Sequence, residues 1–194
     1  MKKLFYGLLA ATIIIVIICG AFAAFGKNSY SDESSIDIPR VSSINLLVLI
    51  DIATGRLRLV TNPSGSMEDT ILTGDKLFFD TKAYAVKEPE RFDVVIFNDP
   101  DGRGVSFVKR IIGLPGETIE IRAGQVYING GEFPLDEPYV KGGAEEDFEL
   151  YEIDENGYFL MGDNRAHSYD SRIWENKCVP AEDIFGKAVF IIEQ

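Results

Sequence analysis

The segment from residue 105 to residue 117 has the sequence VSFVKRIIGLPGE. Val105 to Ile112 is rich in β-branched and aromatic residues, which favours a strand, and Pro115-Gly116 predicts the turn that ends it. Lys109 and Arg110 point to opposite faces of such a strand. The lysine lies either at a sheet edge, with its amine in water, or in the interior, where loss of water lowers its pKa from about 10.4 toward neutrality. In the interior, an uncharged amine can accept a proton from a serine hydroxyl.

The sequence on both sides of this segment has the same short, β-rich pattern. Asn129-Gly130 and Asn156-Gly157 are strong hairpin-turn signals, and Pro180 predicts the start of a single helical turn. No helical periodicity extends beyond residue 25. Residues 44–194 are therefore predicted to form a mostly-β domain, with strands at Leu46–Ile52, Arg56–Thr61, Lys76–Phe79, Phe92–Phe97, Val105–Ile112, Thr118–Ile121, Val126–Ile128, Tyr158–Met161 and Val189–Ile192.

The N-terminal segment carries the strongest apolar signal. Leu4 to Phe25 contains 22 residues without a charge, and a helix of that length spans about 33 Å, enough to cross a bilayer. Lys2 and Lys3 before the run and Ala21-Phe22-Ala23 near its end also resemble a cleavable secretory signal, but the run is long for one. Lipoprotein attachment at Cys19 is disfavoured because the preceding Ile18 is not small.

We therefore interpret residues 1–25 as a short cytoplasmic tip with a single transmembrane anchor. Residues 26–43, which are polar and Ser-rich, are interpreted as a juxtamembrane linker. A slight excess of positive charge at the N-terminus favours a cytoplasmic N-terminus and an extracytoplasmic domain in the cell membrane.

Composition excludes several classes of function. The net charge of −12 disfavours nucleic-acid binding. Of the two cysteines, Cys19 lies in the apolar run, so Cys178 has no partner for an internal disulfide, and one histidine with one cysteine cannot form a usual zinc site. The acidic run from Glu145 to Glu155 is interpreted as a solvated loop or hairpin, because it lacks the spacing of a calcium loop. We expect no metal and no cofactor.

Two further segments carry chemistry. Pro63 to Met67 (PSGSM) follows a predicted strand, and a serine on such a tight turn can supply both a nucleophilic hydroxyl and an oxyanion-binding N–H. Gly162 to Arg172 (GDNRAHSYDSR) alternates acids and arginines, which predicts a loop held by Asp–Arg pairs, with Ser168 available to an amine.

In this order, the three segments resemble bacterial type I signal peptidases. The matching residues are Ser64-Gly65-Ser66-Met67 with Thr70 and Gly74-Asp75, then Lys109 to Glu117, then Gly162 to Arg165 with Ser168, Asp170, Ser171 and Arg172. The resemblance covers Val60 to the C-terminus and the anchor. It implies a membrane-anchored serine endopeptidase of mostly-β fold that removes signal peptides from exported pre-proteins.

The resemblance also implies residue roles. Ser66 matches the nucleophile and Lys109 the general base of a Ser–Lys dyad. Ser64 matches the hydroxyl that completes the oxyanion hole, and Ser168 matches the residue that orients the lysine amine. The loop is implied to be held together by Asp163, Arg165, Asp170 and Arg172. The candidate lining of a shallow pocket for small substrate residues is Val60, Pro63, Met67, Phe107 and Val108.

The expected partners are signal peptides and membrane lipid. The peptide is expected to bind extended along a strand edge. Leu46 to Ile50 is either an apolar patch at the lipid interface or a buried central strand.

The chain departs from the family pattern at two positions near the nucleophile. Asp69 stands where a proline is common, and Asn62 stands where an apolar residue would line the pocket. Both changes bear on rate and specificity, and neither removes a catalytic group.

Three alternatives compete with this interpretation. His167 is a candidate base, with Asp163 or Asp170 orienting it. A self-cleaving repressor-type protease shares the Ser–Lys chemistry, but it needs a DNA-binding helical domain and a scissile site, and the upstream candidate Cys19-Gly20 lies within the apolar run. A non-catalytic membrane adaptor would tolerate loss of the serine and lysine, and both are present.

Overall fold

The computed structural model describes residues 37–140, 143 and 145–193. The predicted anchor, residues 1–25, lies outside the described residues, as does the linker up to residue 36. Within the described part of the chain, no helix is long and apolar enough to cross a membrane.

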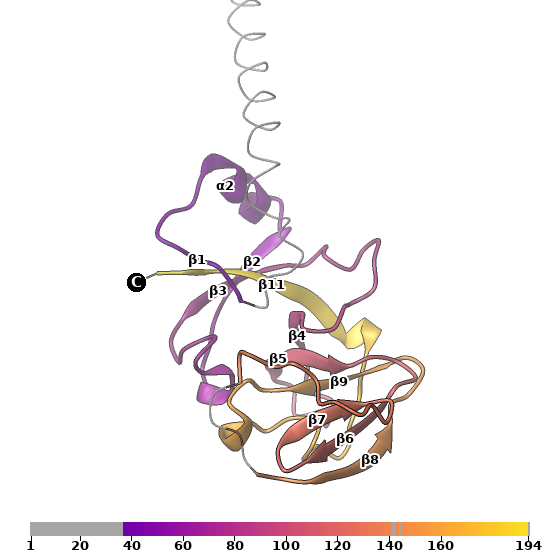
Figure 1. The fold of residues 1–194 in the computed structure, drawn as a ribbon. Helices are drawn as coiled ribbons and strands as arrows, with labels where there is room; N and C mark the ends of the chain where they lie inside the picture. The colour runs from indigo at the N-terminus through magenta and orange to yellow at the C-terminus, as the bar shows by residue number, and fades with distance from the viewer. Residues whose placement is uncertain (1–36, 141–142, 144, 194) are drawn as a thin grey trace, which may run out of the picture. The chain divides into compact units, whose positions relative to one another are not determined.

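The fold is built on two sheets whose strand pairs are antiparallel with one exception (Figure 1). The larger sheet has the order β10 (Val179–Pro180), β9 (Gly157–Met161), β5 (Ser106–Gly113), β4 (Val94–Asn98), β11 (Ile184–Ile192), β3 (Lys76–Asp80) and β2 (Leu57–Thr61). A short strand, β1 (Arg40–Val41), pairs with β11 in parallel. The smaller sheet has the order β7 (Gln125–Ile128), β6 (Thr118–Arg122) and β8 (Phe148–Glu152). The predicted mostly-β fold is confirmed.

The strand predicted at Leu46–Ile52 is wrong. This segment forms the helix α2 (Leu46–Ala53), whose first turn is capped by Asn45, because the Asn45 side chain accepts a hydrogen bond of 3.0 Å from the Val48 backbone N–H. Val48 and Ile52, four residues apart on one helical face, pack against the cluster of Leu57, Phe78 and Phe190. Leu46, Leu49 and Ile50 are exposed, so the helix needs only one buried stripe, whereas a central strand would bury both faces.

The strand β1 lies inside the segment predicted as a polar linker. Arg40 and Val41 pair with Ile191 and Ile192 of β11, and the Arg40 guanidinium bonds the Asp75 carboxylate at 2.7 Å. The end of residues 26–43 is therefore part of the folded domain. The polar, Ser-rich composition gave no sign that β1 pairs with β11, because the partner strand lies far away along the chain.

The predicted turns occur, but they do not join paired strands. Asn129 and Gly130 adopt left-handed φ values of 53° and 65° after β7. Asn156 directly precedes β9, which begins at Gly157, and β8 and β9 belong to different sheets. The two-residue turn that does join paired strands is Ala123-Gly124, between β6 and β7, with φ values of 48° and 78°. An alanine in that conformation gives no turn signal in the sequence. The helical turn expected at Pro180 is present as η3 (Ala181–Asp183).

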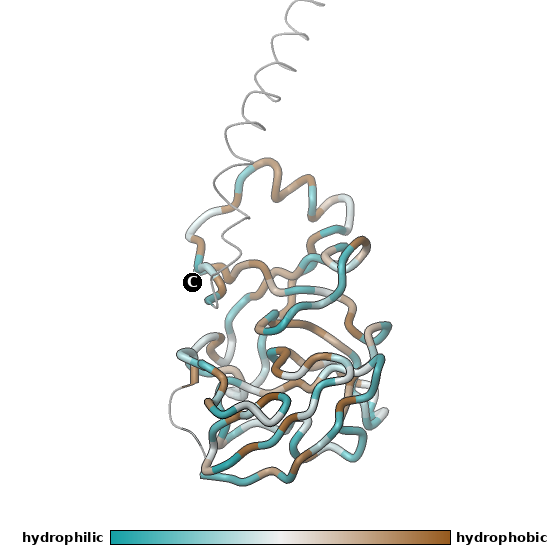
Figure 2. Tube along the Cα trace, turned by 45° about the vertical axis from the view of Figure 1, so that its right-hand side comes forward, coloured by the Kyte–Doolittle hydropathy of each residue, from teal (hydrophilic) through white to brown (hydrophobic). Residues whose placement is uncertain are grey.

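The core follows the strand pattern, with hydrophobic stretches along the strands and on α2 (Figure 2). One cluster includes Met67, Ile71, Leu77, Ile96 and Val108. A second fills the region around the smaller sheet, and a third surrounds the fully buried Trp174. The predicted acidic run contains the strand β8, and most of its acidic side chains are exposed.

Candidate active site

Ser66 is presented on a short 3-10 helix, η1 (Gly65–Met67), five residues after β2. Met67 beside it is fully buried and ties this turn to the core. Ser64, just before the turn, places its hydroxyl 3.3 Å from the hydroxyl of Ser66. Two serine hydroxyls therefore lie side by side in residues 63–67, which we call the nucleophile turn after the role predicted for Ser66.

Lys109 lies in the interior of the larger sheet. It belongs to β5, which pairs with β4 on one side and β9 on the other, and its residue exposure is 2%. Its Nζ lies 2.7 Å from Ser66 Oγ and 3.1 Å from the carbonyl oxygen of Val108. Of the two environments that the sequence allowed, the interior one is observed.

Burial lowers the pKa of Lys109 from 10.5 to about 8, although the carboxylates of Asp170 and Asp163 raise it in part. A substantial fraction of the amine is thus uncharged near pH 8. An uncharged amine at 2.7 Å can accept the hydroxyl proton of Ser66, which is the geometry that a general base requires.

Ser168 is buried in the loop that follows β9, but its expected hydrogen bond to Lys109 is not formed. In the described part of the chain, Ser168 Oγ is a buried polar atom without a hydrogen-bond partner. Gly162 separates it from the nucleophile turn: a Cβ at residue 162 would lie 2.2 Å from Ser168 Oγ and 2.4 Å from the backbone oxygen of Ser66. Ser168 is therefore close to the dyad, within a packing that only glycine permits.

Three of the four predicted loop residues, Asp163, Arg165 and Asp170, are buried and Arg172 is half-buried, but only some of them pair within the loop. Asp170 and Arg172 bond each other at 2.8 Å, and Asp170 also accepts the Gly162 backbone N–H at 3.0 Å. Arg165 instead pairs with Glu137, at 2.5 Å.

Asp163 pairs with the neighbour of the dyad lysine along β5. Two hydrogen bonds of 2.9 and 2.7 Å join it to Arg110, and both side chains are almost fully buried. Asp163 also accepts the Thr70 hydroxyl at 2.6 Å. Strand alternation indicated that Arg110 points away from Lys109, but its partner is 53 residues away along the chain, so sequence reasoning missed it.

Asn164 is a second residue that sequence reasoning missed. Its backbone N–H donates to the Ser66 carbonyl at 3.1 Å, and its side-chain amide donates to the Gly65 carbonyl at 3.0 Å. His167, the alternative base, is exposed, and its Nδ1 lies 3.2 Å from Asn164 Oδ1. The Ser66 hydroxyl is bonded to Lys109. The geometry thus favours the lysine.

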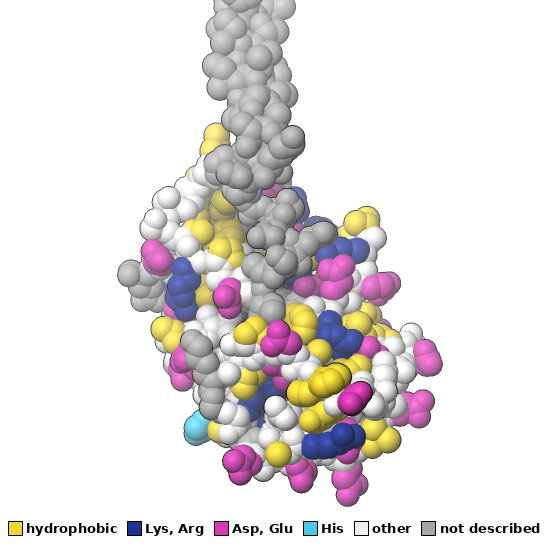
Figure 3. Space-filling model, viewed as in Figure 1, with side chains coloured by type: hydrophobic (Ala, Val, Ile, Leu, Met, Phe, Trp, Pro, Cys, Tyr) yellow, Lys and Arg dark blue, Asp and Glu magenta, His cyan; other side chains and the backbone are white. Residues whose placement is uncertain are grey.

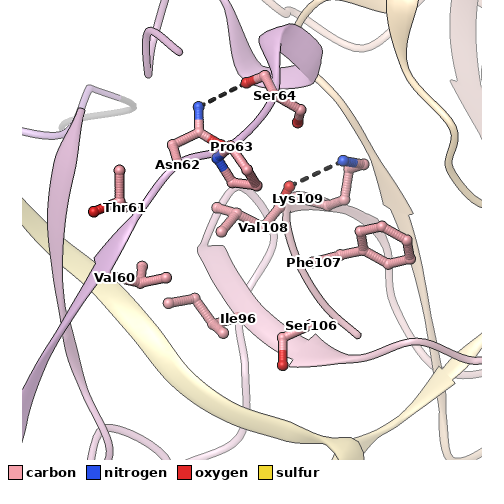
Figure 4. A pocket seen from close by; sticks show the side chains of 10 residues that line it. All are labelled: Val60, Thr61, Asn62, Pro63, Ser64, Ile96, Ser106, Phe107, Val108 and Lys109. Atoms are coloured by element: carbon pink, nitrogen blue, oxygen red, sulfur yellow. Dashed lines mark hydrogen bonds between the residues drawn. The ribbon is translucent and has the colours of Figure 1, made fainter. Parts of the chain in front are cut away.

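A pocket of about 110 Å³ opens beside the dyad (Figure 4). Its walls come from residues 60–64, from Ile96 and from residues 106–109. Four predicted lining residues, Val60, Pro63, Phe107 and Val108, are among them. Met67 is not, because its side chain is wholly buried in the core. Ile96 was missed because β4 becomes a neighbour of β5 only in the folded sheet.

The described residues contain no group of three or more His, Cys, Asp or Glu placed to hold a metal ion. Cys178 is a buried free thiol, and burial raises its pKa. Figure 3 shows acidic side chains spread over the viewed face, with basic ones between them.

Comparison with known proteins agrees with this site. The family described as "Signal peptidase, peptidase S26" matches residues 35–193. "Probable signal peptidase I-2" of Synechocystis is 32% identical over 167 residues, covering 84% of this chain and 75% of that protein. "Signal peptidase I S" of Bacillus subtilis is 38% identical over 118 residues, covering 55% of this chain and 61% of that protein.

A crystal structure of a signal peptidase I from Enterococcus faecalis aligns with a TM-score of 0.44 and 36% identity, covering 53% of this chain and 97% of that one. The family match spans most of the sequence, and the Synechocystis relative aligns over most of both chains. The chain therefore belongs to the signal peptidase family, peptidase S26, as a serine endopeptidase of the type I class.

Proposed function

We propose that this chain removes N-terminal signal peptides from exported pre-proteins by a Ser66–Lys109 acyl-enzyme mechanism. The observation that carries the proposal is the 2.7 Å separation of Lys109 Nζ from Ser66 Oγ, with the amine buried and its pKa lowered to about 8. A buried amine that is easily deprotonated, against a serine hydroxyl, is the arrangement that activates a nucleophile without a histidine.

In the first half of the reaction, Ser66 Oγ attacks the carbonyl carbon before the cleavage site, and uncharged Lys109 takes the hydroxyl proton. The backbone N–H of Ser66 and the hydroxyl of Ser64, which lies 3.3 Å from the nucleophile, stabilise the oxyanion. Lys109 then gives the proton to the leaving nitrogen, the C–N bond breaks, and an ester to Ser66 remains.

In the second half, Lys109 takes a proton from water, whose oxygen attacks the ester carbon. The Ser66 oxygen leaves and regains a proton, and the signal peptide departs with a new carboxylate. Ser168, which is buried beside Gly162, is proposed to orient the amine when substrate is bound. Asp163, Arg165, Asp170 and Arg172 are proposed to hold this loop in place.

The pocket supports a preference for small residues before the cleavage site. Its volume of about 110 Å³ is small, and the apolar side chains of Val60, Ile96 and Val108 contribute to its walls. A larger substrate side chain would clash with these walls. The substrate is proposed to lie extended along a strand edge, so that its backbone completes a ladder of hydrogen bonds.

Membrane attachment is proposed for residues 1–25, with the residues between them and β1 as the connection to an extracytoplasmic domain. The apolar run from Leu4 to Phe25 supports this placement. Leu46, Leu49 and Ile50 of α2 are 66%, 48% and 49% exposed, which supports contact between this helix and lipid. An anchored enzyme would meet its membrane-bound substrates on the same surface.

The decisive test compares the full-length wild type with Ser66→Ala, in detergent, on a pre-protein that carries a signal peptide. We expect cleavage by the wild type and none by Ser66→Ala, followed by gel mobility and by mass spectrometry of the new N-terminus. Ser43→Ala, which changes an exposed serine outside the site, is the matched control and should cleave normally. Equal processing by the wild type and Ser66→Ala would rule out the proposed function.

A further inference from the structure

We propose that Asn62 is a positioning residue, which holds the nucleophile turn in its reactive conformation through its side-chain amide. This inference rests on the proposed Ser66–Lys109 function. Sequence reasoning treated Asn62 as a change in the pocket wall. The structure gives its amide a different set of contacts.

The first observation is how firmly Asn62 itself is held. It follows β2 directly and is 2% exposed. Its backbone N–H donates to the Asp75 carbonyl at 2.9 Å, and its own carbonyl accepts the Gly74 N–H at 2.8 Å. Because both backbone groups of Asn62 are hydrogen-bonded, its Cα position is restrained, and so is the direction in which its side chain leaves the backbone.

The second observation is where the amide points. Its Nδ2 donates to the Ser64 carbonyl at 2.8 Å, to the Leu72 carbonyl at 3.1 Å and to the Ile71 carbonyl at 3.3 Å. The bond to Ser64 is drawn in Figure 4, where the amide is directed at the turn. An amide has two hydrogens, so three acceptors mean that one hydrogen is shared. One side chain thus joins the nucleophile turn to the 71–72 loop.

The carbonyl of Ser64, which the Asn62 amide bonds, lies next to groups of the site. The carbonyl of Ser64 belongs to the peptide plane that leads into Gly65, and the Ser64 hydroxyl lies 3.3 Å from Ser66 Oγ. Pro63 offers no N–H to brace this part of the turn. The Asn62 amide therefore supplies a restraint at this point of the chain through its bond to the Ser64 carbonyl.

An apolar side chain at residue 62 would withdraw the donor from these carbonyl oxygens. The turn would then be free to rotate the Ser64–Gly65 peptide plane, and the Ser64 hydroxyl would lose its position. Because Asn62 acts on the reacting groups through Ser64, its effect should depend on the Ser64 hydroxyl being present. A general structural role would carry no such dependence.

The experiment is a double-mutant cycle in the full-length protein, with kcat and KM measured on a signal-peptide substrate. The variants are Asn62→Leu, which has a similar shape and no donor, Ser64→Ala, and the pair together. We expect Asn62→Leu to lower kcat by roughly 10-fold or more while KM changes by less than about three-fold. In the Ser64→Ala background, the same change should lower kcat by less than about three-fold, because coupled residues are not additive.

Thr81→Val is the matched control. The Thr81 hydroxyl also donates to two backbone carbonyls, those of Gly55 and Arg56, both at 3.1 Å, but at the far end of β2 and β3. Its kcat should stay within about two-fold of the wild type, because it removes comparable bonds away from the turn. If Asn62→Leu does not fold, as judged by circular dichroism, Asn62→Ala removes the donor with a smaller side chain and carries the same expectation.

Three results would overturn the inference: unchanged kcat in Asn62→Leu, equal losses in both Ser64 backgrounds, or an equal loss in Thr81→Val. The wild type and Ser66→Ala are assayed alongside. If the wild type does not cleave, the proposed function fails. If it cleaves and only the cycle is additive, the function stands and the role of Asn62 does not.

Discussion

Lys109 shows how burial can prepare an ordinary side chain for the role of base that we propose for it. In water, a lysine is almost wholly protonated at neutral pH, and it then has no lone pair to accept a proton. Inside β5 its charged form loses hydration, and the nearby carboxylates of Asp163 and Asp170 restore only part of that loss. The lowered pKa and the 2.7 Å contact with Ser66 have the same structural origin, because the strand that buries the amine also aims it at the hydroxyl.

The pH dependence of activity follows from this shift. Below pH 8 Lys109 is mostly protonated and cannot act as a base, so kcat/KM should rise about ten-fold per pH unit up to about pH 8 and then level off. The measurement is kcat/KM on a peptide substrate between pH 6 and 10. A profile that is flat between pH 6 and 8 would contradict an amine base.

His167→Ala is the control for this profile. The ring is exposed and bonds Asn164, so its removal should change kcat/KM by less than about two-fold and leave the midpoint near pH 8. A midpoint lost in His167→Ala would transfer the role of base to the histidine.

Among the elements of the fold, the loop from Gly162 to Arg172 connects the segments that carry Ser66 and Lys109. It contacts the nucleophile turn through Asn164, and it meets β5 through the buried pair of Asp163 and Arg110. It therefore bonds both elements that carry the dyad. The closest approach in this packing is at Gly162, where a side chain would meet the backbone of Ser66.

Gly162→Ala should separate these elements. Its Cβ would lie 2.4 Å from the Ser66 carbonyl oxygen, which cannot move without the nucleophile. We expect a loss of about 1–3 kcal/mol in the free energy of unfolding, as for overpacked cores, and a fall in kcat of roughly 10-fold or more from the displaced turn. Urea unfolding and steady-state kinetics measure the two effects.

Gly143→Ala is the matched control, because a Cβ there meets nothing within 4 Å. It should leave both quantities near their wild-type values. Full activity in Gly162→Ala would mean that the turn tolerates the displacement.

At the scale of the whole molecule, the buried Lys109 amine lowers the free energy of unfolding, and the rest of the fold must offset this loss. A buried lysine destabilises the folded state at any pH where its amine is protonated in the unfolded chain, because the folded chain binds that proton less tightly. The folded pKa of about 8 lies below the unfolded value of 10.5. The penalty is therefore fully present below pH 8, shrinks as pH rises from 8 to 10.5, and is absent above that range.

Lys109→Met should thus be inactive and yet more stable at neutral pH. A shift of this size corresponds to about 3 kcal/mol as an upper limit, from which the lost hydrogen bonds of the amine are subtracted. Urea unfolding of both proteins at pH 7 and at pH 10 gives the difference in the free energy of unfolding. We expect the advantage of the methionine variant to be clearly smaller at pH 10. An advantage that does not change with pH would contradict the lowered pKa.

The sequence by itself determined the fold class and the chemistry. Short β-branched runs separated by turn residues specify a mostly-β domain, because alternation and turn formation are local properties. The Ser66, Lys109 and Gly162 segments identified the family and predicted the Ser–Lys dyad, because these residue types in this order are specific. Local pattern failed at α2, where an apolar run is compatible with either a helix or a strand.

Only the tertiary structure decided which residues meet. Sheet order and loop packing bring Arg110 to Asp163 and place Ile96 in the pocket wall. They also bury Met67 and bring the Asn62 amide to the Ser64 carbonyl. The same holds for the environment of Lys109. The sequence shows which residues precede and follow it, but not how much hydration its amine loses on folding. Pairings across a sheet and desolvation are properties of the folded whole, and that is the physical reason why sequence reasoning left them open.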